Sequence, residues 1–410
     1  MTTAADAFTM PTWRPPRPGR ALARTKALAV VRAALAVAPD RADLKRQLAK
    51  LLYGLDQLTE LIDWLRPLID EEDVDPGLLY WLGQAAERRD PALAAKALRA
   101  AVAAGYDEAF SPLASALERL DRRDEALAAA MSAVERNPSD FRAIVVAVRI
   151  HEARSEFREI SMLCRNLWSR GGRSSQILAT EAFANALTGD DRARDRLADP
   201  DQWLSVWSLP VDAAFNEQLI RELEAGKPLA DLPSTKATLG EGFRFDNVAM
   251  HPGETVQQLM ALVRAAVEHY ARDRARYADH PMIADRPREI DLTSWSLTVR
   301  GDGRESWHLH PSGWISGVYY VRMPSRDKLT AAAGAIEFGP LPFGAERAGL
   351  LPWPRRTILP EAGQLLLFPS YFVHRTWPTG IDEPRTVIAF DVLRAAEAEA
   401  ANPLGNGREA

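Results

Sequence analysis

Cysteine is nearly absent from this 410-residue sequence, in which Cys164 is the single example. One cysteine cannot form an intramolecular disulfide. Cys164 lies in a stretch where apolar residues return with helical periodicity, which favours a small buried hydrophobic side chain over a reactive thiol. A chain without disulfides fits a reducing compartment, so we expect a cytoplasmic protein.

Long apolar runs and an excess of charge of either sign are also lacking. No stretch reaches the roughly 18 apolar residues that a membrane-spanning helix requires. The formal net charge is −5 with 26% charged residues, so we expect neither nucleic acid nor a membrane as a partner. Residues 1–20 contain four prolines but lack the apolar core of a secretion signal, and we expect a disordered or extended lead-in.

Apolar residues are abundant and make up 47% of the chain. A chain of this length exceeds the size at which a single hydrophobic core usually stops growing, so two domains are expected. Residues 21–200 are rich in Ala, Leu, Arg and Glu, with the periodicity of amphipathic helices packed on one another. Helices are expected to start at Pro76, Glu108 and Asp140, and this 32-residue spacing (108 − 76 and 140 − 108) is close to that of helix-hairpin repeats.

The segment 122–138 resembles the second helix of a tetratricopeptide repeat with its closing Asn-Pro, and residues 92–104 supply another helix of small residues. The resemblance covers three to five degenerate repeats, and little survives of the first-helix consensus beyond Leu82-Gly83. Stacked hairpins leave a concave surface suited to peptides or partner proteins. A structural extension or a homodimer contact is the alternative use of the repeats.

The composition changes after Pro200. Residues 201–240 interrupt the helical pattern, apart from an acidic helix at about 215–225, and we interpret them as a junction; a longer helix is expected at about 255–278. Within residues 241–396, β-branched and aromatic residues alternate in short runs, which indicates antiparallel strands. These runs are residues 290–299, 307–310, 315–322, 335–338, 357–359, 364–368 and 385–393. The predicted fold class is α+β, an all-α solenoid followed by a sandwich or jelly roll, with a disordered tail at 397–410.

Three of the seven histidines fall in two short, strand-like stretches. Side chains alternate along a strand, so His308 and His310 are expected to present both imidazoles on one face. His374 follows 64 positions after His310 (374 − 310), on a separate strand able to return to the first pair. A histidine pair alone is often only solvated, but three imidazoles suit a first-row divalent metal and leave positions open for substrate and oxygen.

Arg385 begins a further predicted strand, 11 positions beyond His374 (385 − 374). Near a metal, its planar guanidinium offers a bidentate clamp for a carboxylate, which lysine does not match in geometry. By spacing alone, a surface or interdomain ion pair is the favoured interpretation.

The order of these blocks resembles that of the iron(II)- and 2-oxoglutarate-dependent oxygenase superfamily. The blocks are His308-x-His310, Ser-Gly-Val-Tyr-Tyr-Val at 316–321, Gly-Ala-Ile-Glu-Phe at 334–338, Gly-Gln-Leu-Leu-Leu-Phe-Pro-Ser at 363–370, His374 and Arg385. The similarity covers roughly residues 240–395. It is greatest to the bacterial and phage branch, which has an H-x-H, a Ser-Gly-Val-Tyr-Tyr strand and a Phe-Pro-Ser stretch before the last histidine.

The resemblance implies a double-stranded β-helix (jelly-roll) domain, an iron(II) centre, and the use of 2-oxoglutarate and O2 to hydroxylate a protein, peptide or small-molecule substrate. His308 and His374 would be metal ligands, and Arg385 would pair with the far carboxylate of 2-oxoglutarate. The resemblance also implies roles at the co-substrate for Tyr320 or Tyr319 and for Ser316, and at the pocket wall for Trp295, Ser296 and Trp307.

The sequence departs from the family pattern at two positions. His310 stands where most members have Asp or Glu, so either it completes a three-histidine ligand set or water fills that position. Val387 stands in place of the usual serine two positions after the arginine, so one hydrogen bond to the co-substrate must come from elsewhere.

Two other classes of protein remain alternatives. A cupin-like metal enzyme shares the H-x-H and the later histidine, but Trp-Ile-Ser at residues 314–316 stands where cupins carry a glutamate. A non-enzymatic repeat scaffold with a degenerate barrel is the second. No residue pattern favours one substrate over another.

Overall fold

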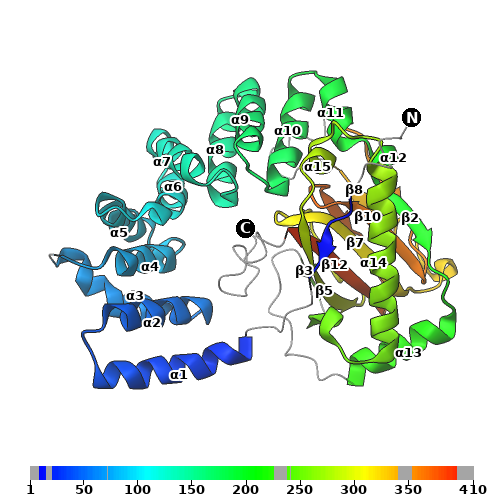
Figure 1. Ribbon diagram of the computed structural model, residues 1–410, viewed down its shortest axis with the longest axis horizontal. Coiled ribbons are helices and arrows are strands. Elements are labelled where there is room, and N and C mark those ends of the chain that lie inside the picture. The colour runs from blue at the N-terminus through cyan, green and yellow to red at the C-terminus, as the bar shows by residue number, and fades with distance from the viewer. Residues whose placement is uncertain are drawn as a thin grey trace. The chain divides into compact units, whose positions relative to one another are not determined.

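The computed structural model describes residues 9–14, 21–71, 73–225, 238–240, 242–339 and 353–394, with side chains from residue 27 onward in the first helix. The chain divides into two compact units. We call Gly19–Ile177 the helical unit, and Leu178–Pro403 together with Met1–Pro18 the barrel unit. Figure 1 shows successive helices in the first and a curled sheet in the second. No described helix is both long and apolar enough to cross a membrane.

The helical unit is a succession of helices with short connections. They are α1 (Ala21–Val37), α2 (Ala42–Gly54), α3 (Leu58–Leu65), η1 (Arg66–Asp70), α4 (Pro76–Ala86), α5 (Pro91–Ala103), η2 (Asp107–Ala109), α6 (Phe110–Arg119), α7 (Arg123–Arg136), α8 (Phe141–Ala153) and α9 (Phe157–Ser169), followed by the start of α10 (Ser175–Leu187). The predicted hairpins are confirmed, since α4, η2 and α8 begin within one residue of the three expected starts. Their identity as tetratricopeptide repeats stays a prediction. Cys164 is buried in α9, as expected.

Local sequence determines where these helices begin and how closely they pack. Asp75, Asp90 and Asp140 each precede a helix and accept a hydrogen bond from a backbone N–H of its first turn, at 2.8, 3.0 and 2.9 Å. Each aspartate thereby satisfies a donor that the helix leaves unpaired. A Cβ atom at Gly83 would lie 2.3 Å from Cγ of Leu98, so the close approach of α4 and α5 requires glycine.

The barrel unit is built on a curled, mixed β-sheet of the jelly-roll type. The larger sheet has the strand order β1-β5-β12-β7-β10-β2, with β4 also paired to β5; a smaller sheet has the order β11-β8-β9, and β3 pairs with β6. The strands are β1 (Thr12–Trp13), β2 (Ser205–Ser208), β3 (Thr238–Leu239), β4 (Gly242–Asp246), β5 (Glu289–Val299), β6 (Arg304–Glu305), β7 (Gly313–Arg322), β8 (Ile336–Phe338), β9 (Arg356–Ile358), β10 (Gln364–Pro369), β11 (His374–Thr376) and β12 (Arg385–Arg394).

Helices accompany the sheet. They are α11 (Asp191–Ala198), α12 (Pro200–Trp203), α13 (Ala213–Ala225), α14 (Glu254–Arg274) and α15 (Pro281–Ala284), with the short turns η3 (Val248–Met250) and η4 (Arg326–Lys328). α13 packs against β7, where the hydroxyl of Tyr319 donates to Oδ1 of Asn216 at 2.6 Å. Both helices expected between residues 201 and 288 are confirmed as α13 and α14.

Strand β7 determines the position of the site. It lies between β10 and β12, and Gly313 to Val321 are all buried. The register pairs Ser316 with Asp391 of β12 on one side and with Phe368 of β10 on the other. Side chains from three strands that are far apart in sequence therefore meet inside the curl.

Most of the predicted strands are confirmed, but the segment Trp307–His310 is not a strand. Only an isolated bridge joins His308 to His374 there, because the chain turns at Pro311 before a ladder can form. Strand β2 lies in the predicted junction yet pairs with β10, so part of that junction belongs to the sheet. Thr12–Trp13 of the expected lead-in is extended and runs parallel to β5. The expected tail at 397–410 lies outside the described residues.

Candidate metal centre

The three predicted histidines come together inside the barrel unit. His308 and His374 exchange backbone hydrogen bonds of 3.0 and 2.9 Å, and the backbone N–H of His310 donates to the carbonyl of Ser370 at 3.0 Å. One ligand nitrogen from each imidazole lies within 4.8 Å of the others. The H-x-H segment reaches this arrangement by docking on the loop around Ser370 rather than as a strand.

Each of the three imidazoles is held at its Nδ1 atom. His308 Nδ1 lies 2.7 Å from the carbonyl oxygen of Ser306, and His374 Nδ1 lies 2.9 Å from that of Phe372. A carbonyl oxygen only accepts, so both Nδ1 atoms carry the hydrogen and both Nε2 atoms keep a lone pair. His310 Nδ1 lies 3.0 Å from a carboxylate oxygen of Asp391. This anchoring leaves three Nε2 atoms as ligands, which is the donor set that a first-row divalent metal requires.

Burial favours the neutral form of these imidazoles. Burial lowers the pKa of His308, and burial together with the two neighbouring imidazoles lowers the pKa of His374 well below its usual value. A histidine ligand must be neutral to bind a metal. The site therefore fits a metal ion in both geometry and protonation.

Arg385 lies in the same pocket and forms no ion pair with any carboxylate that the structure describes. Its side chain is buried, with 3% of the residue exposed, and it donates to the carbonyl of Trp377 at 3.1 Å and to the hydroxyl of Thr376 at 3.0 Å. No carboxylate within the described part of the chain forms an ion pair with it, so the ion pair expected from spacing is absent there. Burial lowers its pKa, and the nearby Tyr320 and Glu305 offset part of that effect.

One pocket joins these groups. Its lining includes the three histidines, Arg385, Tyr320, Trp295 and Glu305, with apolar walls from Leu297, Ile336, Phe368 and Val387. The ring of Trp295 stacks on that of His310 with centroids 5.9 Å apart.

Tyr319 and Ser316, which the resemblance implies at the co-substrate, each use their hydroxyl in a hydrogen bond within the protein. Tyr319 points to the other side of β7, where its hydroxyl donates to Asn216, because side chains alternate along a strand. Of the two tyrosines, Tyr320 is the one that lines the pocket. Ser316 is buried, and its hydroxyl donates to Oδ1 of Asp391 at 2.6 Å and lies 2.8 Å from the hydroxyl of Ser370.

The expected wall residues are also divided. Trp295 lines the pocket, whereas Ser296 and Trp307 are not part of its lining. Trp307 lies under the guanidinium of Arg375, 4.6 Å from ring centroid to Cζ. The alternation that places Trp295 inward along β5 turns Ser296 away.

Sequence reasoning missed Asp391 and Thr376. Asp391 is six positions after Arg385 on β12 (391 − 385), so strand alternation predicts that both side chains share a face. That signal was present in the sequence. Thr376, which holds Arg385, lies on β11, and nothing in the sequence pairs it with the arginine.

Comparison with known proteins gives one family match and a set of distant structures. Residues 293–391 match the model of a family described as "Putative 2OG-Fe(II) oxygenase"; no curated protein matches. A prolyl-4-hydroxylase from Pseudomonas putida is 15% identical, over 48% of this chain and 95% of that one, with a TM-score of 0.33. HygX from Streptomyces hygroscopicus, with nickel and 2-oxoglutarate bound, is 16% identical over 49% and 87%, with a TM-score of 0.33.

A third structure is a prolyl hydroxylase from Trichoplax adhaerens in complex with a peptide fragment of hypoxia inducible factor. It is 14% identical, over 53% of this chain and 95% of that one, with a TM-score of 0.36. At these TM-scores the structural likenesses carry no argument, so the family match carries the identification. The matched segment contains His308, His310, His374 and Arg385. Residues 293–391 of the chain are therefore similar to the 2OG-Fe(II) oxygenase family, whose description names iron(II) and 2-oxoglutarate.

Proposed function

We propose that this protein is a hydroxylase-type dioxygenase in which His308, His310 and His374 hold iron(II) and Arg385 binds 2-oxoglutarate. One observation carries the proposal: a single pocket is lined by three imidazoles with anchored Nδ1 atoms and by a buried arginine that forms no ion pair with any described carboxylate. A buried cation is costly unless an anion joins it. The far carboxylate of 2-oxoglutarate supplies that anion.

Iron(II) bound with 2-oxoglutarate supplies the oxidative chemistry, in which O2 is consumed, 2-oxoglutarate becomes succinate and CO2, and the substrate is hydroxylated. The residues of the chain would bind and orient the metal ion and the co-substrate. Trp377 and Thr376 each take one N–H of Arg385 and leave the others for a carboxylate. Burial raises the pKa of Tyr320 above its ordinary value, so its hydroxyl stays protonated and would be a donor for the co-substrate.

The substrate proposed here is a protein, a peptide or a small molecule. The stacked hairpins of the helical unit favour a polypeptide partner, because such arrays present extended surfaces; dimerisation of the enzyme is their other proposed use. A cytoplasmic location, with neither nucleic acid nor membrane as a partner, belongs to the same proposal and is supported by the single buried cysteine.

Turnover of 2-oxoglutarate tests the reaction. The purified chain is incubated with iron(II), 2-oxoglutarate and O2, and succinate is measured. We expect succinate from the wild type and none above background from His374→Ala. His269→Ala is the matched control, since His269 is exposed on α14, and it should keep wild-type turnover. Iron binding without succinate would support a cupin-like enzyme, and failure to bind iron would support a scaffold.

Metal titration tests the ligand set. Under anaerobic conditions we expect His310→Ala to lower iron(II) affinity at least tenfold. Affinity equal to that of the wild type would remove His310 from the ligand set and place water in that position.

A further inference from the structure

Asp391 closes a hydrogen-bonded ring behind one of the three histidines. One carboxylate oxygen lies 3.0 Å from His310 Nδ1, and the other accepts from the hydroxyl of Ser316 at 2.6 Å. The Ser316 hydroxyl lies 2.8 Å from that of Ser370, whose carbonyl accepts from the backbone N–H of His310. The ring therefore returns to the residue from which it starts, and it fixes both the backbone and the imidazole of His310.

The carboxylate of Asp391 is an unusual group for this position. The residue is 6% exposed, and no Lys or Arg within the described ranges forms an ion pair with it. Among the described residues, the side chain capable of positive charge that contacts it is His310. A buried carboxylate without a cation is costly, so an interior position for Asp391 requires positive charge nearby. A metal ion held by His310 Nε2 would supply that charge.

The three histidines are not anchored equally. His308 and His374 each use the backbone carbonyl two positions earlier, at 2.7 and 2.9 Å, whereas His310 uses a carboxylate from a different strand. His310 is also the residue that stands where most family members have an acid. The negative charge missing from the ligand position is thus present one residue further from the metal.

We propose that Asp391 is the positioning residue of the metal centre: it fixes His310 as an Nε2 ligand and returns, through that imidazole, the negative charge that a directly bound carboxylate provides elsewhere. This inference rests on the proposed function. An imidazole that donates to a carboxylate is a more basic ligand, so His310 with Asp391 approaches the donor strength of an acid. The arrangement explains how a three-histidine site keeps the charge balance of a site with two histidines and one carboxylate.

The variant Asp391→Asn separates charge from shape, because the amide keeps the size and an acceptor oxygen. Anaerobic titration with cobalt(II) measures the affinity, and the visible spectrum of the bound ion reports the ligand set. We expect a 10- to 100-fold weaker cobalt(II) affinity and a changed spectrum, while the metal-free variant unfolds at the wild-type temperature or above. Ser316→Ala is the matched control: it removes one hydrogen bond from the same carboxylate and leaves the charge, so its affinity should fall less than threefold.

A double variant shows whether Asp391 acts through His310. In a His310→Ala background, Asp391→Asn should cost no more than about twofold in cobalt(II) affinity, because the path to the metal is already broken. An equal loss in both backgrounds, or wild-type affinity and spectrum in Asp391→Asn, would overturn the inference. Failure of the wild type itself to bind cobalt(II) would overturn the proposed metal site instead, so the two failures are distinguishable.

A measurement on the wild type keeps the test independent of folding of the variants. Nitrogen-15 chemical shifts of the imidazole identify which ring nitrogen carries the hydrogen. We expect His310 in the metal-free protein to be protonated at Nδ1. Protonation at Nε2 alone would contradict the inference, since Nδ1 would then have no hydrogen to donate to Asp391.

Discussion

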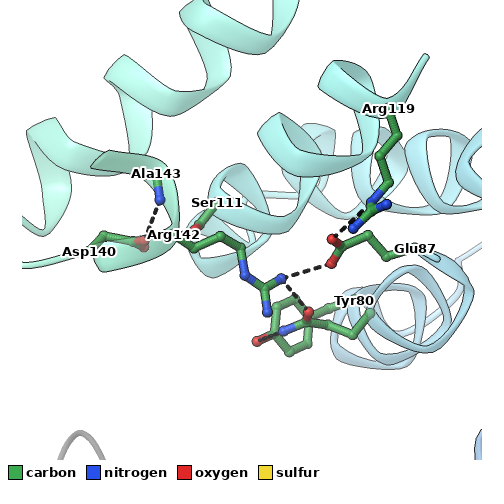
Figure 2. Close-up of polar contacts among 8 residues, drawn as sticks. Tyr80, Glu87, Ser111, Arg119, Asp140, Arg142 and Ala143 are labelled. Carbon is green, nitrogen blue, oxygen red and sulfur yellow. Dashed lines mark hydrogen bonds and ion pairs between the residues drawn. The ribbon is translucent and has the colours of Figure 1, made fainter. Parts of the chain in front are cut away.

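Two arginines, one in each unit, show opposite ways of placing a guanidinium among packed side chains. Arg142 of the helical unit donates to Oε1 of Gln84 at 2.8 Å and to a carboxylate oxygen of Glu87 at 3.0 Å (Figure 2). Arg385 of the barrel unit donates to a carbonyl and a hydroxyl and has no carboxylate among the described residues. The first arginine has a carboxylate partner, whereas the second has only neutral partners among the described residues.

The pKa of Arg142 is raised and that of Arg385 is lowered, because the balance between burial and neighbouring charges differs at the two sites. Burial acts to lower the pKa of Arg142, but Glu87 and the neighbouring tyrosines outweigh it and the pKa is raised. At Arg385 burial prevails, and the pKa is lowered. The half-exposed, paired Arg142 is a structural group, whereas a buried arginine without an ion pair among the described residues is a candidate site for a ligand of opposite charge.

The surroundings of Arg142 are those of a structural group. It projects from α8 to α4 across α6 (Figure 2), and Glu87 also lies 3.6 Å from Arg119. Asp140, the cap of α8, accepts from the hydroxyl of Ser111 on α6 at 2.8 Å. Three hairpins are therefore connected by polar contacts, and every charge in the group has a partner.

Removal of Arg385 should have the largest effect. We expect Arg385→Met to weaken 2-oxoglutarate binding at least about 100-fold, because a charge-assisted bidentate pair is lost, while the metal-free protein is as stable as the wild type or more stable. Anaerobic calorimetry with nickel(II) in place of iron, and thermal unfolding, measure the two effects. A clear loss of stability with 2-oxoglutarate binding retained would make Arg385 a structural residue like Arg142.

Removal of Arg142 should have the opposite effect, a loss of stability with 2-oxoglutarate binding unchanged. We expect Arg142→Met to lower the free energy of unfolding by about 1–2 kcal/mol, since Glu87 loses its nearer cation; because the Arg142 side chain is 37% exposed, solvent screening keeps the loss at this level. Urea unfolding measures it, and a double variant with Glu87→Gln isolates the pair. Binding of 2-oxoglutarate should equal that of the wild type, and a changed affinity would contradict the comparison.

The smallest expected effect concerns His280. This buried ionisable group stays neutral, which distinguishes it from the two charged arginines. Its Nδ1 accepts from the backbone N–H of Met282 at 3.1 Å, and its Nε2 lies 3.2 Å from the hydroxyl of Tyr371. Burial, with a smaller contribution from the charge of Arg196, lowers the pKa of His280 to about 3. This group needs neither an ion pair nor a ligand.

The sign of the resulting pH dependence follows from proton uptake. Below the ordinary value near 6.5 the unfolded chain binds a proton at His280 that the folded chain does not, so the contribution is present above pH 6.5 and decreases towards pH 3. Between pH 7 and 5.5 the wild type should lose about 1 kcal/mol more of its unfolding free energy than His280→Gln. Urea unfolding at both pH values measures the difference, and parallel losses in the two proteins would show that His280 titrates normally.

Much of the fold and of the site could be predicted from the sequence. Alternation of side chains predicted β5, β7, β10 and β12, and helical periodicity with the 32-residue spacing predicted the hairpins, because these signals are local. Spacing and the family resemblance together predicted that His308, His310 and His374 form one site. Alternation also implied that one of Tyr319 and Tyr320 faces the pocket, but which one depends on the direction in which the sheet curls.

Other parts of the site lay beyond local signals. The edge strand β2 was predicted as part of a junction, since its role arises from pairing with β10 about 160 positions later (367 − 205). The contact of Asp391 with His310 depends on the register between β7 and β12 and on the docking of the H-x-H segment on Ser370. Neither is encoded in a short window of sequence.

The sequence by itself determined which chemical groups this protein carries and in what order: three histidines able to bind a metal, an arginine able to bind a carboxylate, and a chain of amphipathic hairpins before them. The tertiary structure alone decided which of the charged groups have partners. Arg142 has Glu87, Arg385 has none within the described structure, and His310 has Asp391. The reason is physical, since electrostatic energy depends on distance and burial in space, and these pairs are separated by 55 and 81 positions in the chain.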